Sequence, residues 1–182
     1  RASSVIDVAI TQMACVEHPK KNRARQAALI EQAAKRGAKI ICTQEMFASQ
    51  YFCQVEDHRF FALAESIPGP STDRFAKIAR QHGVVIVASL FEKRAPGLYH
   101  NTAVVFERDG SIVATYKKTH IPGHEHHEPD RPFQHAERYY FEPSPDGFGV
   151  WRAFGSIVGM AICNDRRWPE TYREMGLQGV EL

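Results

Sequence analysis

Short β-prone runs alternate with helical segments over the first part of the chain, and this alternation constrains the fold more than any other feature. Strands are expected at 5–13 and 39–43, with an amphipathic helix at about 21–36 between them. A second helix follows, with Ser71 as its expected N-cap and Gly83 as its stop. This order is typical of an α/β fold, in which helices cover a sheet.

Three consecutive β-runs follow without an intervening helix, at 84–92, 99–106 and 110–118. Turn residues separate them, so we expect an antiparallel meander within the otherwise alternating pattern. Two more strands are expected, near 148–153 and 156–163, and then a further helix that begins with a proline. The sequence therefore predicts an α/β class of fold that contains a meander.

The long polar segment 119–147 is dense in His, Glu and Pro, and we expect it to wall a site. Its imidazoles and carboxylates belong to residue types that bind zinc, but their spacing matches no closed zinc pattern. Contact with substrate or solvent is the favoured interpretation, and we expect no metal and no organic cofactor. The side chains considered for a metal are those of His124, Glu125, His126, His127, Glu128, Asp130 and His135.

Composition narrows the function classes. The chain is 43% hydrophobic and 24% charged, as soluble globular proteins are. Its net charge of +2, without a run of like charges, gives no reason to expect nucleic acid or a membrane as a partner. The four cysteines form no CxxC pair and the N-terminus carries no apolar signal segment, which favours a cytoplasmic location.

Cys163 stands where an apolar run ends and charged residues begin. A cysteine in an apolar run is more often an inert core residue. Cys163 differs because Arg166 and Arg167 follow it, just before a helix start, where positive potential lowers a thiol pKa. We therefore predict a reactive thiol there, while the inert interpretation is kept for Cys15, Cys42 and Cys53.

Two other charged groups follow β-runs. Glu45 ends the run that begins at Lys39, at the edge of the sheet where α/β folds place ligands, and it is a candidate general base. The alternative is that Glu45 is an ordinary solvated carboxylate at the end of a strand. Lys117 and Lys118 end another run, and strand alternation sends them to opposite faces, so only one can enter a pocket. An ammonium group there would stabilise an oxyanion.

Glu45, Lys118 and Cys163, in this order, resemble the catalytic triad of the nitrilase (carbon-nitrogen hydrolase) superfamily. The sequence blocks that carry the resemblance are 44–47, 116–122 and 162–170. Within the superfamily, 131–135 and 163–170 look most like N-carbamoyl-D-amino-acid amidohydrolases. The segments 11–15 and 51–54 are instead similar to N-carbamoylputrescine amidohydrolases.

The resemblance covers residues 5–182 and implies an α-β-β-α sandwich that is commonly assembled into homo-oligomers. Family members continue beyond the equivalent of Leu182, and 179–182 looks like the start of another strand. We therefore expect residues 1–182 to be the N-terminal portion of one such domain, incomplete at its C-terminal end.

The resemblance also implies the chemistry. The expected reaction is cysteine-dependent hydrolysis of an N-carbamoyl amino acid to free amino acid, ammonia and carbon dioxide. The open alternatives are N-carbamoylputrescine, another amide or nitrile, and a self-associating fragment without activity. Glu137 is similar to a second active-site glutamate of the superfamily. Substrate binding is expected from Glu137, His135, Asn164, Arg166 and Arg167.

Overall fold

A computed structural model describes residues 5–123, 128 and 130–182. Four of the side chains considered for a metal, those at 124–127, lie outside the described residues. The centre of the fold is a five-stranded sheet whose spatial order follows the chain. Its strands are β1 (Val8–Ile10), β2 (Ile40–Cys42), β3 (Val85–Ala95), β4 (Leu98–Phe106) and β5 (Ile112–Lys117).

Strand direction determines which loops meet at one edge of the sheet. β1, β2 and β3 are parallel, whereas β4 is antiparallel to β3 and β5 is antiparallel to β4. β5 therefore runs in the direction of β2, and the carboxyl ends of these two strands lie at the same edge. The residues that follow them, Glu45 and Lys118, are brought to that edge by topology alone.

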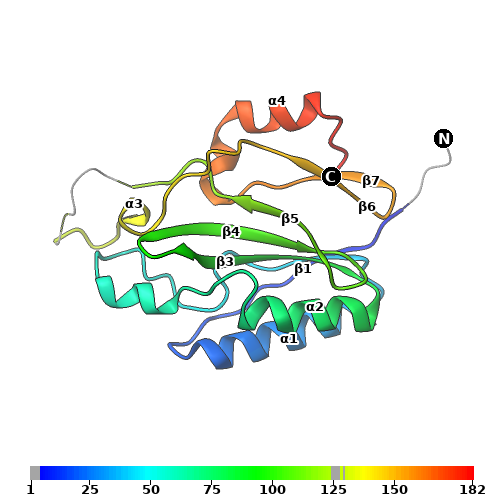
Figure 1. Ribbon diagram of the computed structural model, residues 1–182, viewed down its shortest axis with the longest axis horizontal. Coiled ribbons are helices and arrows are strands. Elements are labelled where there is room, and N and C mark those ends of the chain that lie inside the picture. The colour runs from blue at the N-terminus through cyan, green and yellow to red at the C-terminus, as the bar shows by residue number, and fades with distance from the viewer. Residues whose placement is uncertain (1–4, 124–127, 129) are drawn as a thin grey trace.

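Two helices cover one face of the sheet, α1 (Pro19–Lys35) and α2 (Pro70–His82) (Figure 1). They bury apolar side chains such as Ile30 and Phe75 against it. Gly83 ends α2 in the left-handed conformation, at φ +63°, as the sequence predicts. The predicted N-cap was wrong, because Gly69 holds that position and the Ser71 hydroxyl instead donates to a Glu65 carboxylate oxygen.

The opposite face carries a hairpin and a helix. β6 (Val150–Ala153) and β7 (Ser156–Gly159) form a separate two-stranded sheet, and α4 (Pro169–Leu177) lies beyond it (Figure 1). Their apolar core residues belong to one cluster with those of the central sheet's second face. The layers thus follow the order α-β-β-α, which confirms the predicted fold class.

Two predicted strand limits in this half were wrong. β7 ends at Gly159, because the chain then turns toward the short 3₁₀ helix Cys163–Arg167 instead of continuing the strand. The last residues form no strand, although Glu181 N–H donates to Ile157 O at 2.7 Å, beside β7. The thiol is therefore presented by a turn, not by a strand end.

Loops at the carboxyl edge of the sheet are held by aromatic packing. Phe52 stacks on Phe91 at 5.1 Å and meets Tyr140 edge-on at 4.9 Å. Phe52 lies in the long loop after β2, which also contains the 3₁₀ helix His58–Leu63. Tyr140 is the last residue of α3 (Glu137–Tyr140), a short helix inside the long polar segment. This cluster fixes two loops that are far apart in the sequence beside each other.

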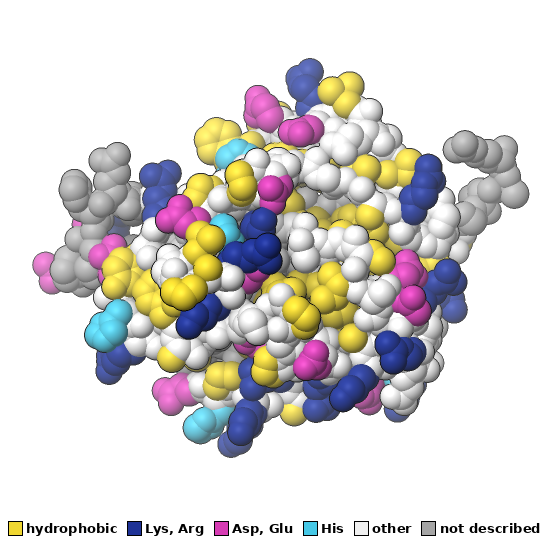
Figure 2. All heavy atoms as spheres, viewed as in Figure 1, with side chains coloured by type: hydrophobic (Ala, Val, Ile, Leu, Met, Phe, Trp, Pro, Cys, Tyr) yellow, Lys and Arg dark blue, Asp and Glu magenta, His cyan; other side chains and the backbone are white. Residues whose placement is uncertain are grey.

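Charged side chains of both signs are interspersed over the face seen in Figure 2, in keeping with the small net charge. In the described part of the chain, every helix is too short or too polar to cross a membrane.

Candidate active site

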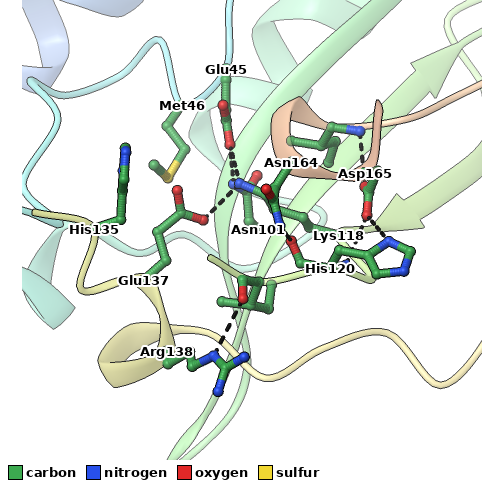
Figure 3. Close-up of polar contacts among 12 residues, drawn as sticks. Glu45, Met46, Asn101, Lys118, His120, His135, Glu137, Arg138, Asn164 and Asp165 are labelled. Carbon is green, nitrogen blue, oxygen red and sulfur yellow. Dashed lines mark hydrogen bonds and ion pairs between the residues drawn. The ribbon is translucent and has the colours of Figure 1, made fainter. Parts of the chain in front are cut away.

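A buried ammonium group lies at the centre of the site. Lys118 is fully buried, and its Nζ donates to Glu45 Oε1 at 2.9 Å and to Glu137 Oε2 at 2.7 Å (Figure 3). A buried ammonium persists only when anionic partners offset its lost hydration. The two carboxylates supply that compensation, and Lys118 in turn holds them in one place.

Strand pairing explains why Lys118 turns inward. Its backbone N–H donates to Asn101 O at 2.8 Å, which extends the β4–β5 ladder by one residue. Because side chains alternate along a strand, the neighbouring Lys117 points outward and pairs with Asp146 at the surface at 2.6 Å. Of the two lysines, only Lys118 reaches the site.

Glu45 follows β2 and is held by a chain of polar contacts. Asn101 Nδ2 donates to Glu45 Oε1 at 2.7 Å, and Ser89 Oγ donates to Asn101 Oδ1 at 3.2 Å. The next residue, Met46, has a positive φ of +46° and donates its N–H to the same Ser89 hydroxyl. Such left-handed backbone is costly for a residue with a side chain and is enriched at functional sites.

Glu137 begins α3 and is 1% exposed. Its Oε2 accepts from Lys118, while its Oε1 accepts from the Tyr51 hydroxyl at 3.0 Å. The same hydroxyl lies 2.8 Å from Nδ1 of His135, whose side chain is exposed. The structure thus brings Glu137 into contact with Lys118. His135 contacts Tyr51 and is linked to Glu137 only through the hydroxyl of that tyrosine.

Cys163 opens the 3₁₀ helix with a φ of +47° and is exposed. Cys163 and Glu45 line one pocket of about 320 Å³, whose other walls are mainly apolar and include Val87, Trp151 and Met160. The left-handed turn lifts the thiol out of the preceding backbone direction, into a pocket that the carboxylate shares. A nucleophile on a strained turn is a recurrent way to present a reacting atom.

The predicted lowering of the Cys163 pKa was wrong. Although Cys163 is exposed as a residue, partial burial of its thiol raises the pKa above the usual value, the neighbouring Glu45 carboxylate raises it further, and Lys118 opposes this. Arg166 and Arg167 are exposed, and the charged groups that shift the thiol pKa are instead Glu45, Lys118 and Glu137. A thiol with a raised pKa needs a proton acceptor to react near neutral pH, and the Glu45 carboxylate lies close enough to be a candidate for that role.

The charges of the cluster depend on one another. Burial alone would lower the pKa of Lys118, but Glu45 and Glu137 together raise it above its usual value. Burial raises the pKa of Glu137, while Lys118 and the Tyr51 hydroxyl oppose that rise. The ammonium form of Lys118 is therefore favoured at all physiological pH values.

The remaining expected substrate-binding residues, Asn164, Arg166 and Arg167, are not among those that line the pocket. Asn164 is half-buried, and its Nδ2 donates to His120 O at 3.0 Å, which ties it to the backbone after Lys118. Arg166 and Arg167 are exposed, and they are not among the residues that line the pocket with Glu45 and Cys163. Within the described chain, no carboxylate pairs with either arginine.

Two residues of the site escaped the sequence reasoning. Asn101 interrupts an apolar β-run with an amide, and that buried polar position was a usable signal. Tyr51 lies in the aromatic loop after Glu45, where nothing local distinguishes it from its neighbours. Over the described residues, His, Cys, Asp and Glu form no group of three that could hold a metal ion.

In this layered α/β protein a thiol, a carboxylate and an enclosed ammonium meet at one edge of the sheet, an arrangement that could support acyl transfer. Comparison with known sequences specifies the family. The carbon-nitrogen hydrolase family model matches residues 7–182. The chain belongs to the carbon-nitrogen hydrolase family.

Several relatives are similar over nearly the whole chain. An N-carbamoylputrescine amidase from Solanum lycopersicum is 37% identical over 98% of this chain and 57% of its own length. A citrullinase from Francisella tularensis is 36% identical over 97% and 59%. The solved carbon-nitrogen hydrolase from Helicobacter pylori G27 is 40% identical, with a TM-score of 0.84 over 96% of this chain and 57% of its own. The chain thus spans less than two thirds of the length of these proteins.

Proposed function

We propose that this protein hydrolyses the carbamoyl C–N bond of N-carbamoyl amino acids, giving free amino acid, ammonia and carbon dioxide. The observation that carries the proposal is the position of Glu45, which adjoins the Cys163 thiol in one pocket and accepts a hydrogen bond from Lys118. One carboxylate in contact with both a nucleophile and a fixed cation suits acyl transfer.

In the first half of the reaction, Glu45 accepts the thiol proton while the sulfur adds to the carbamoyl carbon. Lys118 has three N–H donors, and Glu45 and Glu137 engage two of them. The third donor is assigned to the oxyanion that forms on the carbamoyl oxygen. The intermediate collapses by breaking the bond to the terminal nitrogen, which takes the proton from Glu45 and leaves as ammonia.

In the second half, water cleaves the thioester that remains on Cys163. Glu45, again unprotonated, removes a proton from the water as it adds to the carbonyl carbon, and Lys118 donates to the oxyanion a second time. Collapse expels the sulfur, and the proton on Glu45 returns to it. The released carbamic acid decomposes to the free amine and carbon dioxide, so the thiol and the carboxylate regain their starting states.

Glu137 acts through Lys118 in this scheme. It is buried and bonded to the ammonium, so it helps to fix the position of that donor beside Glu45. An ammonium group bonded to two carboxylates stays in place when the substrate binds, so the donor to the oxyanion is preorganised.

One observation supports a carbamoyl substrate, and a second supports a carboxylate on that substrate. The names of the similar amidase and citrullinase point to carbamoyl-type substrates. Arg166 and Arg167 stand three and four residues after Cys163 on the same 3₁₀ helix, exposed and able to receive a carboxylate as a bidentate partner. Replacing either by Ala is expected to raise KM for acidic substrates while leaving kcat nearly unchanged.

Ammonia release from a panel of N-carbamoyl amino acids tests the proposal, with Cys163→Ala as the matched variant. The wild-type protein is expected to release ammonia, and the variant to fold and release none. Ammonia release at the wild-type rate from Cys163→Ala would remove the thiol from the reaction.

N-carbamoylputrescine is the second candidate substrate, favoured by the name of the tomato relative. It lacks a carboxylate, so a higher kcat/KM for it than for every carbamoyl amino acid would replace the first proposal. Absence of turnover on both groups and on simple amides, together with self-association in size-exclusion chromatography, would favour a role without catalysis.

A further inference from the structure

We propose that Asp165 is a positioning residue that locks the Cys163 turn to the strand end carrying Lys118. The inference rests on the proposed function, since it assigns these two side chains to one reaction. Asp165 is fully buried, and its carboxylate accepts four hydrogen bonds from two separate segments of the chain. No step of the mechanism above uses it.

One oxygen of Asp165 joins the two segments directly. Oδ2 accepts from Ile162 N–H at 3.0 Å, and Ile162 immediately precedes the nucleophile. The same atom accepts from the Tyr116 hydroxyl at 2.6 Å, two residues before Lys118. A single atom therefore connects the turn of Cys163 with the strand of Lys118.

The other oxygen holds the far side of Lys118. Oδ1 accepts from His120 N–H at 2.8 Å and lies 2.9 Å from His120 Nδ1, as Figure 3 shows. Tyr116 lies two residues before Lys118 and His120 two residues after it, so Asp165 is hydrogen-bonded to the chain on both sides of the lysine. A shift of the Cys163 turn relative to Lys118 would break several of these bonds at once.

Neighbouring contacts reinforce the same link. Asn164 Nδ2 donates to His120 O at 3.0 Å, and the His120 ring stacks on Trp168 with centroids 4.9 Å apart and planes 17° from parallel. Thr171 Oγ1 donates to the backbone oxygen of Asp165 at 2.9 Å and anchors the start of α4. The turn is thus held from the strand side and from the helix side.

The backbone of Cys163 explains why such a lock is needed. A φ of +47° is unfavourable for cysteine, and the turn keeps it only if surrounding bonds determine it. The four charge-assisted hydrogen bonds accepted by Asp165, two residues after Cys163, hold the turn in this conformation. The expected role of Asp165 is to keep the sulfur in line with Glu45 and Lys118.

Asp165→Asn tests the role with almost no change in shape. In either orientation the new amide NH₂ faces a backbone N–H, that of Ile162 or that of His120, so one of the two loses its acceptor. We expect kcat to fall about 10- to 100-fold, the effect of a small misplacement of reacting groups, with KM within about twofold. The rate of Cys163 alkylation by iodoacetamide is expected to change several-fold, because its distance from Glu45 changes.

Glu65→Gln is the matched control, since Glu65 is a nearly buried carboxylate that accepts from Arg23 and Ser71, away from the site. It is expected to lower stability without changing kcat or the alkylation rate. If Asp165→Asn behaves like this control, the inference is overturned. Tyr116→Phe, which removes one donor only, decides the case if Asp165→Asn does not fold: unchanged kcat and unchanged alkylation rate would overturn it equally.

The alkylation readout separates this inference from the proposed function. A wild-type protein that turns over no carbamoyl or amide compound refutes the proposed function. An altered alkylation rate in Asp165→Asn would still support the lock in that case, and an unaltered rate would reject it.

Discussion

Lys118 Nζ donates to Glu45 Oε1 at 2.9 Å although the two residues are 73 positions apart. The contact arises because β2 and β5 run in the same direction, so that the residues after each strand converge. It means that the proposed base and the proposed oxyanion donor move as one unit. Changes to either residue are therefore expected to alter the chemistry of both.

Replacement of Lys118 by Met is expected to leave Glu45 and Glu137 facing each other without a cation. Removing one partner of a buried ion pair costs about 3–5 kcal/mol, so the free energy of unfolding should fall by that amount and turnover should cease. Lys117→Met is the matched control, because its pair with Asp146 is exposed and such pairs contribute about 0–1 kcal/mol. Urea denaturation of both variants checks the prediction, and equal losses would contradict it.

Stability at high pH follows from the raised pKa of Lys118, in which the two carboxylates overcome the opposing effect of burial. Its ionised form stabilises the fold fully below the unfolded value of 10.5, and this contribution is lost as pH rises through the higher folded value. The stability difference between the wild-type protein and Lys118→Met is expected to be constant near neutral pH and to shrink above about pH 10.5. Urea denaturation over a pH series measures it, and a difference that grows with pH would refute the assignment.

Asn101→Asp is expected to replace a donor to Glu45 by a repelling carboxylate. Since Asn101 Nδ2 lies 2.7 Å from Glu45 Oε1, kcat should fall about 10- to 100-fold, less than the loss of the whole 10²–10⁴-fold contribution of a positioned base because Glu45 itself remains. Asn22→Asp is the control: Asn22 is also buried, but it bonds the backbone of Val16 and Ala48, away from the site. The control should lose stability while the folded fraction keeps its kcat, and steady-state kinetics would expose any other outcome.

Tyr51→Phe removes the hydroxyl that donates to Glu137. A hydrogen bond to a charged group contributes about 1.5–3 kcal/mol, so kcat is expected to fall about 10-fold as Glu137 holds Lys118 less firmly. Tyr140→Phe is the counterpart, because its hydroxyl donates to Val55 O at 2.6 Å and touches no carboxylate of the site. That variant should lower the melting temperature and leave kcat unchanged, and the prediction fails if the two variants give the same kinetics.

Hydrophobic periodicity and turn residues were enough to predict the class of fold and most of its helices and strands, because both reflect local conformational preferences. The alternation of β-runs and helices anticipated the central sheet, and Lys118 was separated from Lys117 by strand alternation alone. The N-cap was misplaced because Ser71 bonds Glu65, a contact that no local pattern reveals. Glycine marks most left-handed turns in a sequence, so the positive φ of Cys163 left no trace in its residue type.

The electrostatics of the site were less accessible from the sequence. Arg166 and Arg167 are adjacent to Cys163 in the chain, and adjacency suggested a lowered thiol pKa. In space the thiol faces Glu45, which is 118 residues earlier by number and reaches it only through the sheet topology. A charge acts through distance, so the order of residues along the chain gave the wrong sign.

The raised pKa of Cys163 leads to a further prediction. Burial raises the thiol pKa, and Glu45 raises it further, so Glu45→Gln is expected to bring it down toward the usual value. Alkylation of Cys163 by iodoacetamide near neutral pH should then become faster while turnover falls by about 10²–10⁴-fold, because the neutral amide accepts no proton. The two rates are expected to change in opposite directions in this one variant.

Peptide mapping by mass spectrometry assigns the alkylation to its cysteine. Cys53 is fully buried and should stay unmodified in the folded protein, which makes it an internal check that the variant has not opened. Glu65→Gln, a nearly buried carboxylate change away from the thiol, should alkylate at the wild-type rate. Slower or unchanged alkylation of Cys163 in Glu45→Gln would mean that the carboxylate does not raise the thiol pKa, and the proton transfer proposed between them would lose its basis.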